Sequence, residues 1–195
     1  MASITPWRQL LLDSIQANKH LRHSEYFQLA TVKENGRPAN RTVVFRGFIQ
    51  GTEKLQFTTD ARSQKIEEIK TQAFGEICWY FTDSREQFRI GGFLNVIGNA
   101  ETNPLRLKIR EQAWFQSSLD SRLQFAGPSP GIPCVKNGPD DNTTPKLDPA
   151  EGPVENFCLV TLEPQEVDYL NLRKMKRYSF VKTGDFSWTQ RELIP

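Results

Sequence analysis

The sequence has few of the residues that build metal sites and disulfide frameworks. It contains two histidines, His20 and His23, and three cysteines, Cys78, Cys134 and Cys158, with no CxxC spacing. Zinc centres need clusters of such ligands, and a histidine-based catalytic triad needs a histidine as its base. We therefore expect no metal cofactor. An odd number of unclustered cysteines also predicts reduced thiols and a cytoplasmic location.

Long apolar runs and a large charge surplus are also missing. No run is long enough to cross a bilayer, and the first eight residues lack the basic and apolar regions of a secretory signal. We therefore expect a soluble protein that is not exported. The formal net charge is only +2, which argues against nucleic acid as a partner and means that any anion site must be local.

Short runs rich in β-branched and aromatic residues dominate the chain after Tyr26 and predict strands. The first hairpin is marked by Asn35-Gly36, and a Gly91-Gly92 pair predicts a bulge or a close backbone approach. Strands are expected from Tyr26 to this turn and at 41–48, 54–59, 74–82, 87–100, 157–162, 166–172 and 177–182. The pattern indicates a mainly β (α+β) fold, a small antiparallel barrel with flanking helices.

Three helices and one irregular segment complete the expected single domain over residues 1–195. One helix should begin at Pro6 with Thr5 as its cap, and a short one after Ser63 should turn its isoleucines inward. A third should run from Pro104 toward Phe125. Residues 127–156 hold seven of the twelve prolines, so we expect an exposed loop that is mobile at its centre. The tail at 188–195 is expected to dock through its Trp, Leu and Ile.

The run Arg41-Thr42-Val43-Val44-Phe45-Arg46 places a guanidinium at each end of an apolar strand. Alternation puts Arg41 on one face with Val43, and Arg46 on the other, so whichever face is buried takes an arginine with it. A buried guanidinium needs an anion or several acceptors, and its planar fork suits a phosphate or carboxylate. The alternative is an edge strand whose arginines lie in solvent or pair with Glu or Asp.

Two later segments carry compatible chemistry. Residues 57–65 run from a strand end to a helix start, where hydroxyls, amide groups, Arg62 and Lys65 could converge on an anion. The alternative is a capped helix with solvated basic residues. In residues 87–92, the amide of Gln87 both donates and accepts, as the edge of a heteroaromatic ring requires.

Taken in order, these segments resemble the pyridoxamine 5′-phosphate oxidase-like FMN-binding split-barrel family over most of the chain. The family patterns Arg-x-Val-Leu-Leu-Lys, aromatic-Thr with Ser-Arg-Lys, and Gln-Val-Arg-x-x-Gly are similar to residues 41–46, 57–65 and 87–92. Further matches are Asp120-Ser121, Leu162-Glu163, Arg177-Tyr178 and the ending at 192–195.

The resemblance implies FMN at the interface of a homodimer and a small-molecule substrate that gives a hydride to flavin N5. It implies that the main chain from Val43 to Phe45 runs along the flavin ring and that Gln87 binds its pyrimidine edge. The phosphate contacts that it implies are Arg41, Thr58, Arg62, Ser63 and Lys65. The whole implied cofactor set is Arg41, Thr42, Val43, Val44, Phe45, Arg46, Phe57, Thr58, Arg62, Ser63, Gln64, Lys65, Gln87 and Arg177. Arg46 and Arg173 are the implied substrate-facing residues.

The chain departs from the family pattern mainly on the substrate side. Gln64 replaces one phosphate-binding arginine. Arg173-Lys174-Met175 stands where the oxidase has Arg-x-His, Ala113 and Ser117 fall near its substrate-phosphate tyrosine and arginine, and Leu170 replaces its tryptophan. These departures leave open an FMN-dependent reductase of another small molecule, or a flavin-binding protein without oxidase turnover. A third alternative is a barrel that binds nucleic acid or protein.

Overall fold

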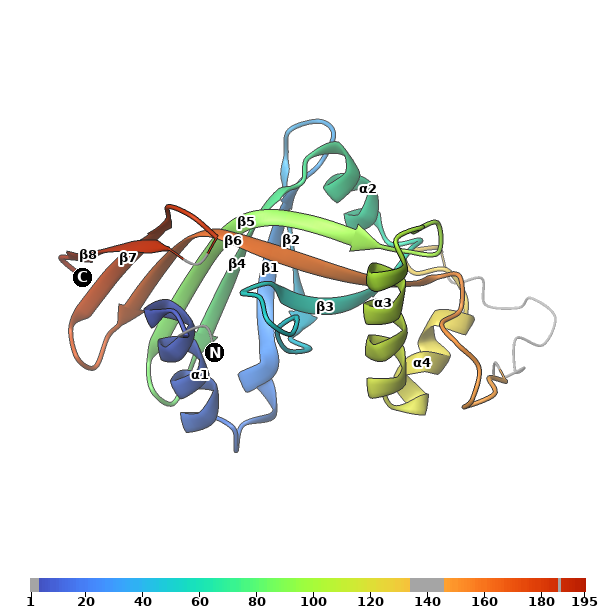
Figure 1. The fold of residues 1–195 in the computed structure, drawn as a ribbon, viewed down its shortest axis with the longest axis horizontal. Coiled ribbons are helices and arrows are strands. Elements are labelled where there is room, and N and C mark those ends of the chain that lie inside the picture. The colour runs from blue at the N-terminus through green and yellow to red at the C-terminus, as the bar shows by residue number, and fades with distance from the viewer. Residues whose placement is uncertain (1–3, 134–145, 186) are drawn as a thin grey trace. The chain divides into compact units, whose positions relative to one another are not determined.

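The computed structural model describes residues 4–133, 146–185 and 187–195, which form a mainly antiparallel β protein (Figure 1). The sheet has the order β2-β1-β4-β5-β6-β7-β8, and β3 pairs with β6. The strands are β1 (Tyr26–Val32), β2 (Pro38–Val44), β3 (Leu55–Asp60), β4 (Phe74–Phe81), β5 (Glu86–Ile97), β6 (Phe157–Asn171), β7 (Lys176–Lys182) and β8 (Trp188–Leu193). The helices are α1 (Pro6–Ala17), the 3-10 helix η1 (Arg22–Glu25), α2 (Gln64–Thr71), α3 (Pro104–Gln116) and α4 (Leu119–Ala126). The predicted mainly β architecture with flanking helices is confirmed.

The described residues group into two compact units. The first draws on Met1–Phe57, Glu68–Asn95 and Thr161–Pro195, and the second on Thr58–Glu67 and Val96–Val160. The single domain expected over residues 1–195 stays a prediction. In the described part of the chain, no helix is both long and apolar enough to span a bilayer.

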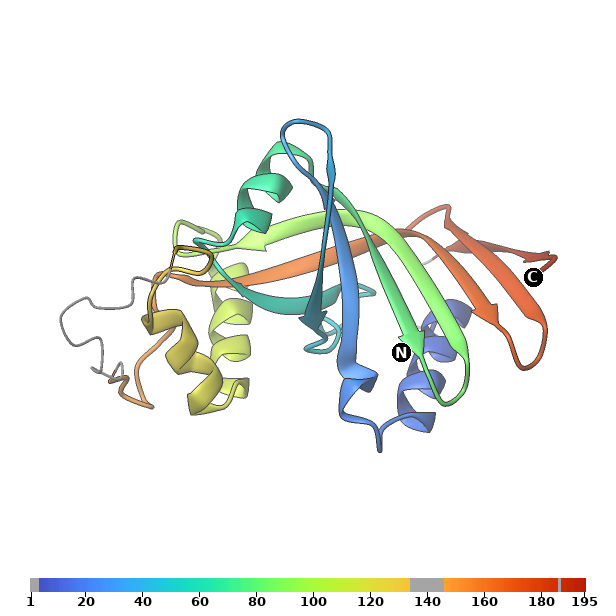
Figure 2. The same cartoon turned by 180° about the vertical axis from the view of Figure 1, so that it is seen from behind.

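The β1–β2 hairpin forms around Asn35-Gly36 as predicted, with Gly36 at φ +77°. Figure 2 shows this hairpin from behind. The expected bounds of 41–48 for the second strand are wrong, because β2 begins at Pro38 and ends at Val44. Beyond it, Gly47 adopts φ +98°, and the Arg46 amide donates to Gln56 O over 2.8 Å. The chain therefore leaves β1 and turns toward the start of β3.

Aromatic side chains form the core of the first unit. Trp79 stacks on Phe81 with ring centroids 5.3 Å apart and also contacts Phe27 and Phe45. Its indole N–H donates to Ser24 O over 3.0 Å, so the polar edge of this buried ring is satisfied. The segment around Phe45 is thereby packed against the strand that carries Trp79.

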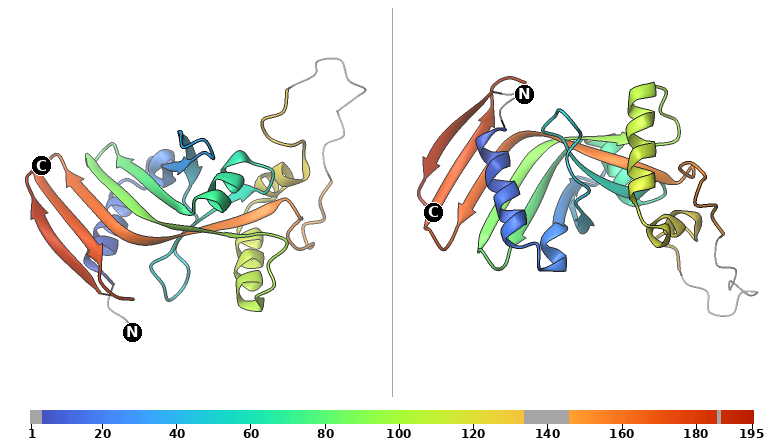
Figure 3. Two further views of the ribbon diagram at one scale, coloured as in Figure 1. Left: turned by 90° about the horizontal axis from the view of Figure 1, so that it is seen from above. Right: turned by 60° about the horizontal axis from the view of Figure 1, so that its bottom comes forward.

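The two ends of the described chain meet at Glu53. Thr5 is the N-cap residue of α1 as predicted, but its hydroxyl donates to Glu53 rather than accepting from a helix amide. Trp188 of β8 donates to the same carboxylate over 2.7 Å and packs on Trp7 at 5.5 Å. Figure 3 shows β8 as the outermost strand of the sheet. Trp188 therefore docks as expected, whereas Ile194 is 91% exposed and does not.

Strand β6 is one continuous element of 15 residues, so the two separate strands expected at 157–162 and 166–172 are wrong. The predicted close approach at Gly92 is confirmed. A Cβ added to Gly92 would lie 2.2 Å from the carbonyl oxygen of Glu163 in β6. Glycine at this position lets the β5 backbone lie close to the backbone of its neighbour β6.

The single helix expected from Pro104 toward Phe125 is two helices in the structure. Ser118 caps α4 by accepting from the Ser121 amide, which breaks the run after α3. Trp114 and Phe125 then pack across the two helices at 6.3 Å. In the loop expected at 127–156, the described flanks contain no helix or strand. Its centre at 134–145, where mobility was expected, lies outside the described residues.

Candidate functional site

A cation and two hydroxyls gather where β3 leads into α2. The Lys65 Nζ lies 2.9 Å from Thr59 Oγ1 and 2.5 Å from Ser63 Oγ. The Ser63 amide donates to Asp60 O and the Ile66 amide donates to Ser63 O, so a tight turn sets the Ser63 hydroxyl at the helix start. A phosphate accepts hydrogen bonds from ammonium groups, hydroxyls and the amides at a helix start. This donor set fits a phosphate monoester.

Arg62, the neighbouring cation, is held by Asp60. Its Nε and Nη2 donate to the two carboxylate oxygens over 2.9 and 2.7 Å, and Nη1 donates to Gly127 O over 3.1 Å. Burial alone would raise the pKa of Asp60, but the hydrogen bonds and charge of Arg62 outweigh it and lower that pKa. Thr58 is half-buried and Gln64 is exposed at the first position of α2. A role for Arg62 in phosphate binding stays a prediction.

Arg41 lies in a second, buried network. Its guanidinium donates to Glu68 Oε2 over 2.6 Å, to Thr31 Oγ1 over 2.5 Å and to Leu29 O over 3.2 Å. The side chain of Glu68 is 7% exposed and that of Arg41 22%. Burial would raise the pKa of Glu68, but the hydrogen bonds from Thr31 and Arg41 outweigh it and lower that pKa. The carboxylate therefore stays ionised at neutral pH and holds the guanidinium in one orientation.

The apolar residues of the Arg41 strand divide between its faces as alternation predicts. Val43 is buried on the same face as Arg41, whereas Thr42 and Arg46 are exposed on the other and Val44 is half-buried. The Phe57 ring is buried 6.0 Å from Phe27, so this side chain belongs to the core. The structure thus leaves the main chain, rather than the side chain, of Phe57 as its possible contact with a ligand.

The remaining candidates lie on later strands. Gln87 is half-buried on β5 opposite Tyr80. Arg177 of β7 forms an ion pair with Asp168 at 2.9 Å. Arg173 is exposed in the turn between β6 and β7. None of these positions conflicts with its predicted role, and each role stays a prediction.

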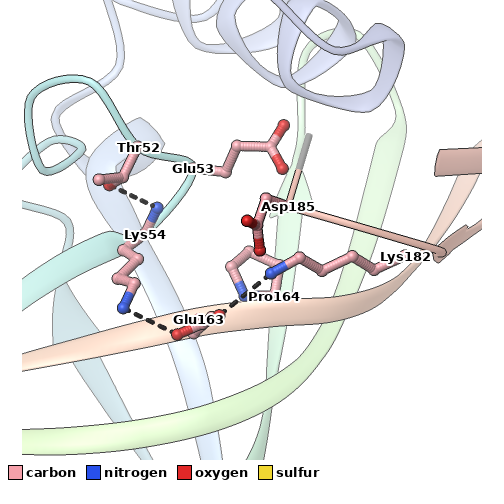
Figure 4. A pocket seen from close by; sticks show the side chains of 7 residues that line it. All are labelled: Thr52, Glu53, Lys54, Glu163, Pro164, Lys182 and Asp185. Carbon is pink, nitrogen blue, oxygen red and sulfur yellow. Dashed lines mark hydrogen bonds and ion pairs between the residues drawn. The ribbon is translucent and has the colours of Figure 1, made fainter. Parts of the chain in front are cut away.

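Two pockets in the first unit contain charged side chains. In one, of about 230 Å³, Lys54 and Lys182 both point at Glu163 (Figure 4), at 2.8 and 3.0 Å. Hydrogen bonds from Lys54 and Lys182 outweigh burial and lower the pKa of Glu163. Both lysines are therefore paired with one carboxylate, which links Lys54 and Lys182 of β7 to β6. The other pocket, of about 390 Å³, is lined by Arg46 with Lys19 and Arg22.

Sequence reasoning missed the carboxylates that hold the arginines. Glu68 is separated from Arg41 by 27 residues, and only the folded hairpin brings it into contact. In a short polar helix a glutamate carries no signal of burial, because solvated glutamates are common there. Asp60 could have been suspected, since an acidic residue two positions before an arginine in a turn often pairs with it. In the described residues, no group of three or more His, Cys, Asp or Glu side chains is arranged to hold a metal ion.

Comparison with known proteins adds an independent line of evidence. Residues 4–98 match the family described as "Pyridoxamine 5'-phosphate oxidase, FMN-binding domain". The chain is 50% identical over 196 aligned residues, 98% of each chain, to pyridoxine/pyridoxamine 5′-phosphate oxidase 2 of Arabidopsis thaliana. It superposes with a TM-score of 0.92 and 41% identity on a pyridoxamine 5′-phosphate oxidase-related, FMN-binding protein of Nostoc punctiforme, covering 99% of this chain and 100% of that one. PhzG of Burkholderia lata shares the fold at 16% identity and a TM-score of 0.71, covering 100% of this chain and 99% of that one.

Proposed function

Because this chain belongs to the pyridoxamine 5′-phosphate oxidase family of FMN-binding proteins, we propose that it is an FMN-dependent oxidoreductase acting on a small molecule. When bound, FMN supplies a ring whose N5 atom accepts a hydride from the substrate. The protein supplies binding, orientation and electrostatics. The single observation that carries the proposal is the 50% identity along 98% of the chain to a named oxidase.

The residues that would hold the phosphate of FMN are cations and hydroxyls. Lys65, Ser63 and Thr58 would bind it at the start of α2, and Arg41 and Arg62 would add charge-assisted hydrogen bonds. Each guanidinium has five N–H groups. Arg41 uses three of them on Leu29, Thr31 and Glu68, which leaves two for a further acceptor. Arg62 uses four on Asp60, Gly127 and Pro128, which leaves one. The donor chemistry of the Lys65 group supports this assignment.

The residues that would contact the ring are apolar or amide. The main chain of Val43 to Phe45 would lie along the flavin, and the Gln87 side chain would pair with its pyrimidine edge. Arg46 would face the substrate, and Arg173 would orient the substrate ring. The exposure of both arginines supports a role outside the core.

We expect the purified protein to be yellow and to bind FMN in preference to riboflavin. Lys65→Ala should weaken FMN binding roughly tenfold, since a charge-assisted contact is worth about 1.5 to 3 kcal/mol. The affinity for riboflavin should stay within about twofold, because riboflavin lacks the phosphate. Fluorescence titration of the apoprotein with each ligand measures both constants.

Lys108→Ala is the matched control for this titration, because it removes one exposed lysine from α3 with the same change in charge. It should leave both constants unchanged. An equal loss of affinity for FMN and riboflavin in Lys65→Ala would mean that Lys65 does not bind the phosphate. A protein that binds neither ligand would contradict the proposed function itself.

We also propose that the protein is a homodimer. The structure buries Trp79, Phe81 and Leu94 within one chain, but leaves Tyr80 40% and Phe93 48% exposed. Phe93 packs edge-on against Phe74, itself 37% exposed, at 5.5 Å. Such a surface is typical of an interface. Light scattering at micromolar concentration with FMN bound should report a dimer, and a monomer would contradict the proposal.

A second candidate is an FMN-dependent reductase of another small molecule, or a flavin protein without oxidase turnover. The observation that favours it is Lys174-Met175 after Arg173, where the family's oxidase has a histidine two positions on. We therefore expect weak or absent oxidation of pyridoxamine 5′-phosphate. If turnover is found, Arg46→Ala should reduce it more than Arg173→Ala. Steady-state peroxide production tests this, and turnover of about 1 s⁻¹ or faster at low micromolar substrate would contradict the expectation. A cytoplasmic location stays part of the proposal.

A further inference from the structure

Three charged side chains lie together on neighbouring strands of the first unit, on the same side of the sheet as Gln87. They are Arg89 of β5, Asp168 of β6 and Arg177 of β7, which we term the Arg89 cluster. We infer that this cluster raises the reduction potential of the bound flavin, with Arg89 supplying positive charge and Asp168 holding both guanidiniums in place. The inference rests on the proposed function, because it takes Gln87 to contact the pyrimidine edge of FMN.

Strand alternation brings these side chains to one side of the sheet. Gln87 and Arg89 are two residues apart on β5, so they point the same way, whereas Phe88 between them is fully buried on the other side. On β6, both sequence neighbours of Asp168 are buried, so its carboxylate faces away from that core. Because β6 lies between β5 and β7, this carboxylate reaches a guanidinium on each side.

Asp168 holds the two guanidiniums through hydrogen bonds. Arg177 Nη2 donates to Asp168 Oδ2 over 2.9 Å, and Arg177 Nε lies 3.2 Å from both carboxylate oxygens. Arg89 Nη2 donates to the same Oδ2 over 3.4 Å. The Asp168 side chain is only 18% exposed, against 33% for Arg177 and 44% for Arg89. The carboxylate is therefore the most enclosed group of the cluster, and the guanidiniums are the groups that a ligand on this face would meet.

The cluster carries a net positive charge, because two guanidiniums share one carboxylate. Arg177 uses two of its five N–H groups on Asp168, so three remain for a further acceptor. Glu166, the next side chain on this side of β6, is exposed beside Gly91 and so lies farther along β5 from Gln87. The positive charge is therefore nearest to the end of β5 that carries Gln87.

Positive charge at this place favours the reduced form of the flavin. Reduction adds two electrons and, at neutral pH, one proton to the ring, so the ring gains one negative charge, which its pyrimidine half carries. A nearby cation stabilises that charge and has much less effect on the neutral oxidised ring. Charge near N1 is one of the means by which a protein tunes a flavin. Arg89 and Arg177 therefore raise the reduction potential, and the charge of Asp168 limits the rise.

Potentiometric titration of the FMN-loaded protein against a reference dye, under anaerobic conditions and at low salt, tests the inference. Arg89→Ala should lower the ratio of the affinities for reduced and oxidised FMN about three- to tenfold, which lowers the potential by about 15 to 30 mV for a two-electron couple. Arg89→Glu should lower the potential about twice as much, and Arg89→Lys should stay near wild type because lysine keeps the charge. Asp168→Asn keeps one acceptor for the guanidiniums but removes the negative charge, so it should raise the potential by about 15 to 30 mV.

Arg37→Ala is the matched control, because it removes one exposed arginine from the β1–β2 turn, outside the cluster. It should leave the potential unchanged. The inference is overturned if the potentials of the Arg89 variants do not follow their charge, if Asp168→Asn lowers the potential, or if the control shifts it as much. Any of these results with FMN still bound would leave the proposed function standing. Failure of wild type to bind FMN would instead overturn the proposed function, and this inference with it.

Discussion

Arg41→Ala is expected to lower the free energy of unfolding of the apoprotein by about 2 to 4 kcal/mol at neutral pH. The reason is that Glu68, 7% exposed, would remain buried without its cation. The same variant should bind FMN roughly tenfold more weakly and riboflavin with little change. Chemical denaturation of the apoprotein and titration with the two ligands measure these effects separately.

Glu68→Gln separates the two roles of Arg41. In the Arg41→Ala/Glu68→Gln double variant the buried charge is gone, so most of the lost unfolding free energy should return. The preference for FMN should not return, since the guanidinium is still missing. A double variant as unstable as Arg41→Ala would show that the ion pair is not what stabilises the hairpin against α2. A double variant that regains FMN affinity would exclude Arg41 from the phosphate site.

The stability provided by this pair should depend on pH in a defined direction. The pKa of Glu68 is lowered in the folded protein from its ordinary value of 4.5. Its contribution is therefore complete above about pH 4.5 and is lost as the pH falls through the lower folded pKa. The difference in unfolding free energy between wild type and Arg41→Ala should accordingly shrink in acid. A constant difference from pH 7 to pH 3 would contradict this coupling.

Gly92→Ala is expected to be the most disruptive single substitution among those considered. The new Cβ would lie 2.2 Å from Glu163 O and 2.9 Å from the Cα of Pro164. Both are backbone atoms of β6, which cannot turn aside as a side chain can. Overpacking a well-packed site lowers the free energy of unfolding by about 1 to 3 kcal/mol, occasionally more. For Gly92→Ala we expect a loss of about 3 kcal/mol or a failure to fold. Thermal unfolding and soluble yield measure the effect.

Gly91→Ala provides the control at the next residue. Its Cβ would lie 2.9 Å from Glu166 Oε1, the end of a flexible and exposed side chain that can rotate away. Gly91→Ala should lower the free energy of unfolding by less than about 1 kcal/mol. Equal losses in the two variants would mean that glycine is needed for backbone conformation along β5 rather than for its contact with β6.

The sequence predicted the local features of this protein well where they depend on neighbouring residues. Strand alternation placed Arg41 and Arg46 on opposite faces, and the structure has the alternative of an edge strand, with Arg41 half-buried and paired with Glu68 and Arg46 exposed. Asn35-Gly36 marked the hairpin turn. The end of β2 was mistaken because Gly47 and a hydrogen bond to Gln56 redirect the chain there. Both depend on a partner that lies further along the sequence.

The parts of the site that sequence reasoning could not supply are those made by tertiary contact. The residues near Arg41 in the sequence do not indicate that Glu68 is its partner. Lys19 and Arg22 look like ordinary solvated cations in the sequence, and only the folded chain shows that they line one pocket with Arg46. The phosphate-binding candidates Ser63 and Lys65 were found because a helix start gathers its donors within a few residues. Sites of this local kind are the ones that a single sequence reveals.

The packing of Trp79 gives the protein an internal optical probe. Its indole contacts Phe45, at 4.9 Å between ring centroids, in the segment proposed to run along the flavin. Tryptophan emission overlaps flavin absorption, so excitation energy should pass to a bound isoalloxazine and the emission should be quenched. The other indoles, Trp7, Trp114 and Trp188, contact residues outside that segment. The difference in emission between wild type and Trp79→Phe during titration would isolate the Trp79 signal, which would report cofactor loading without any external label.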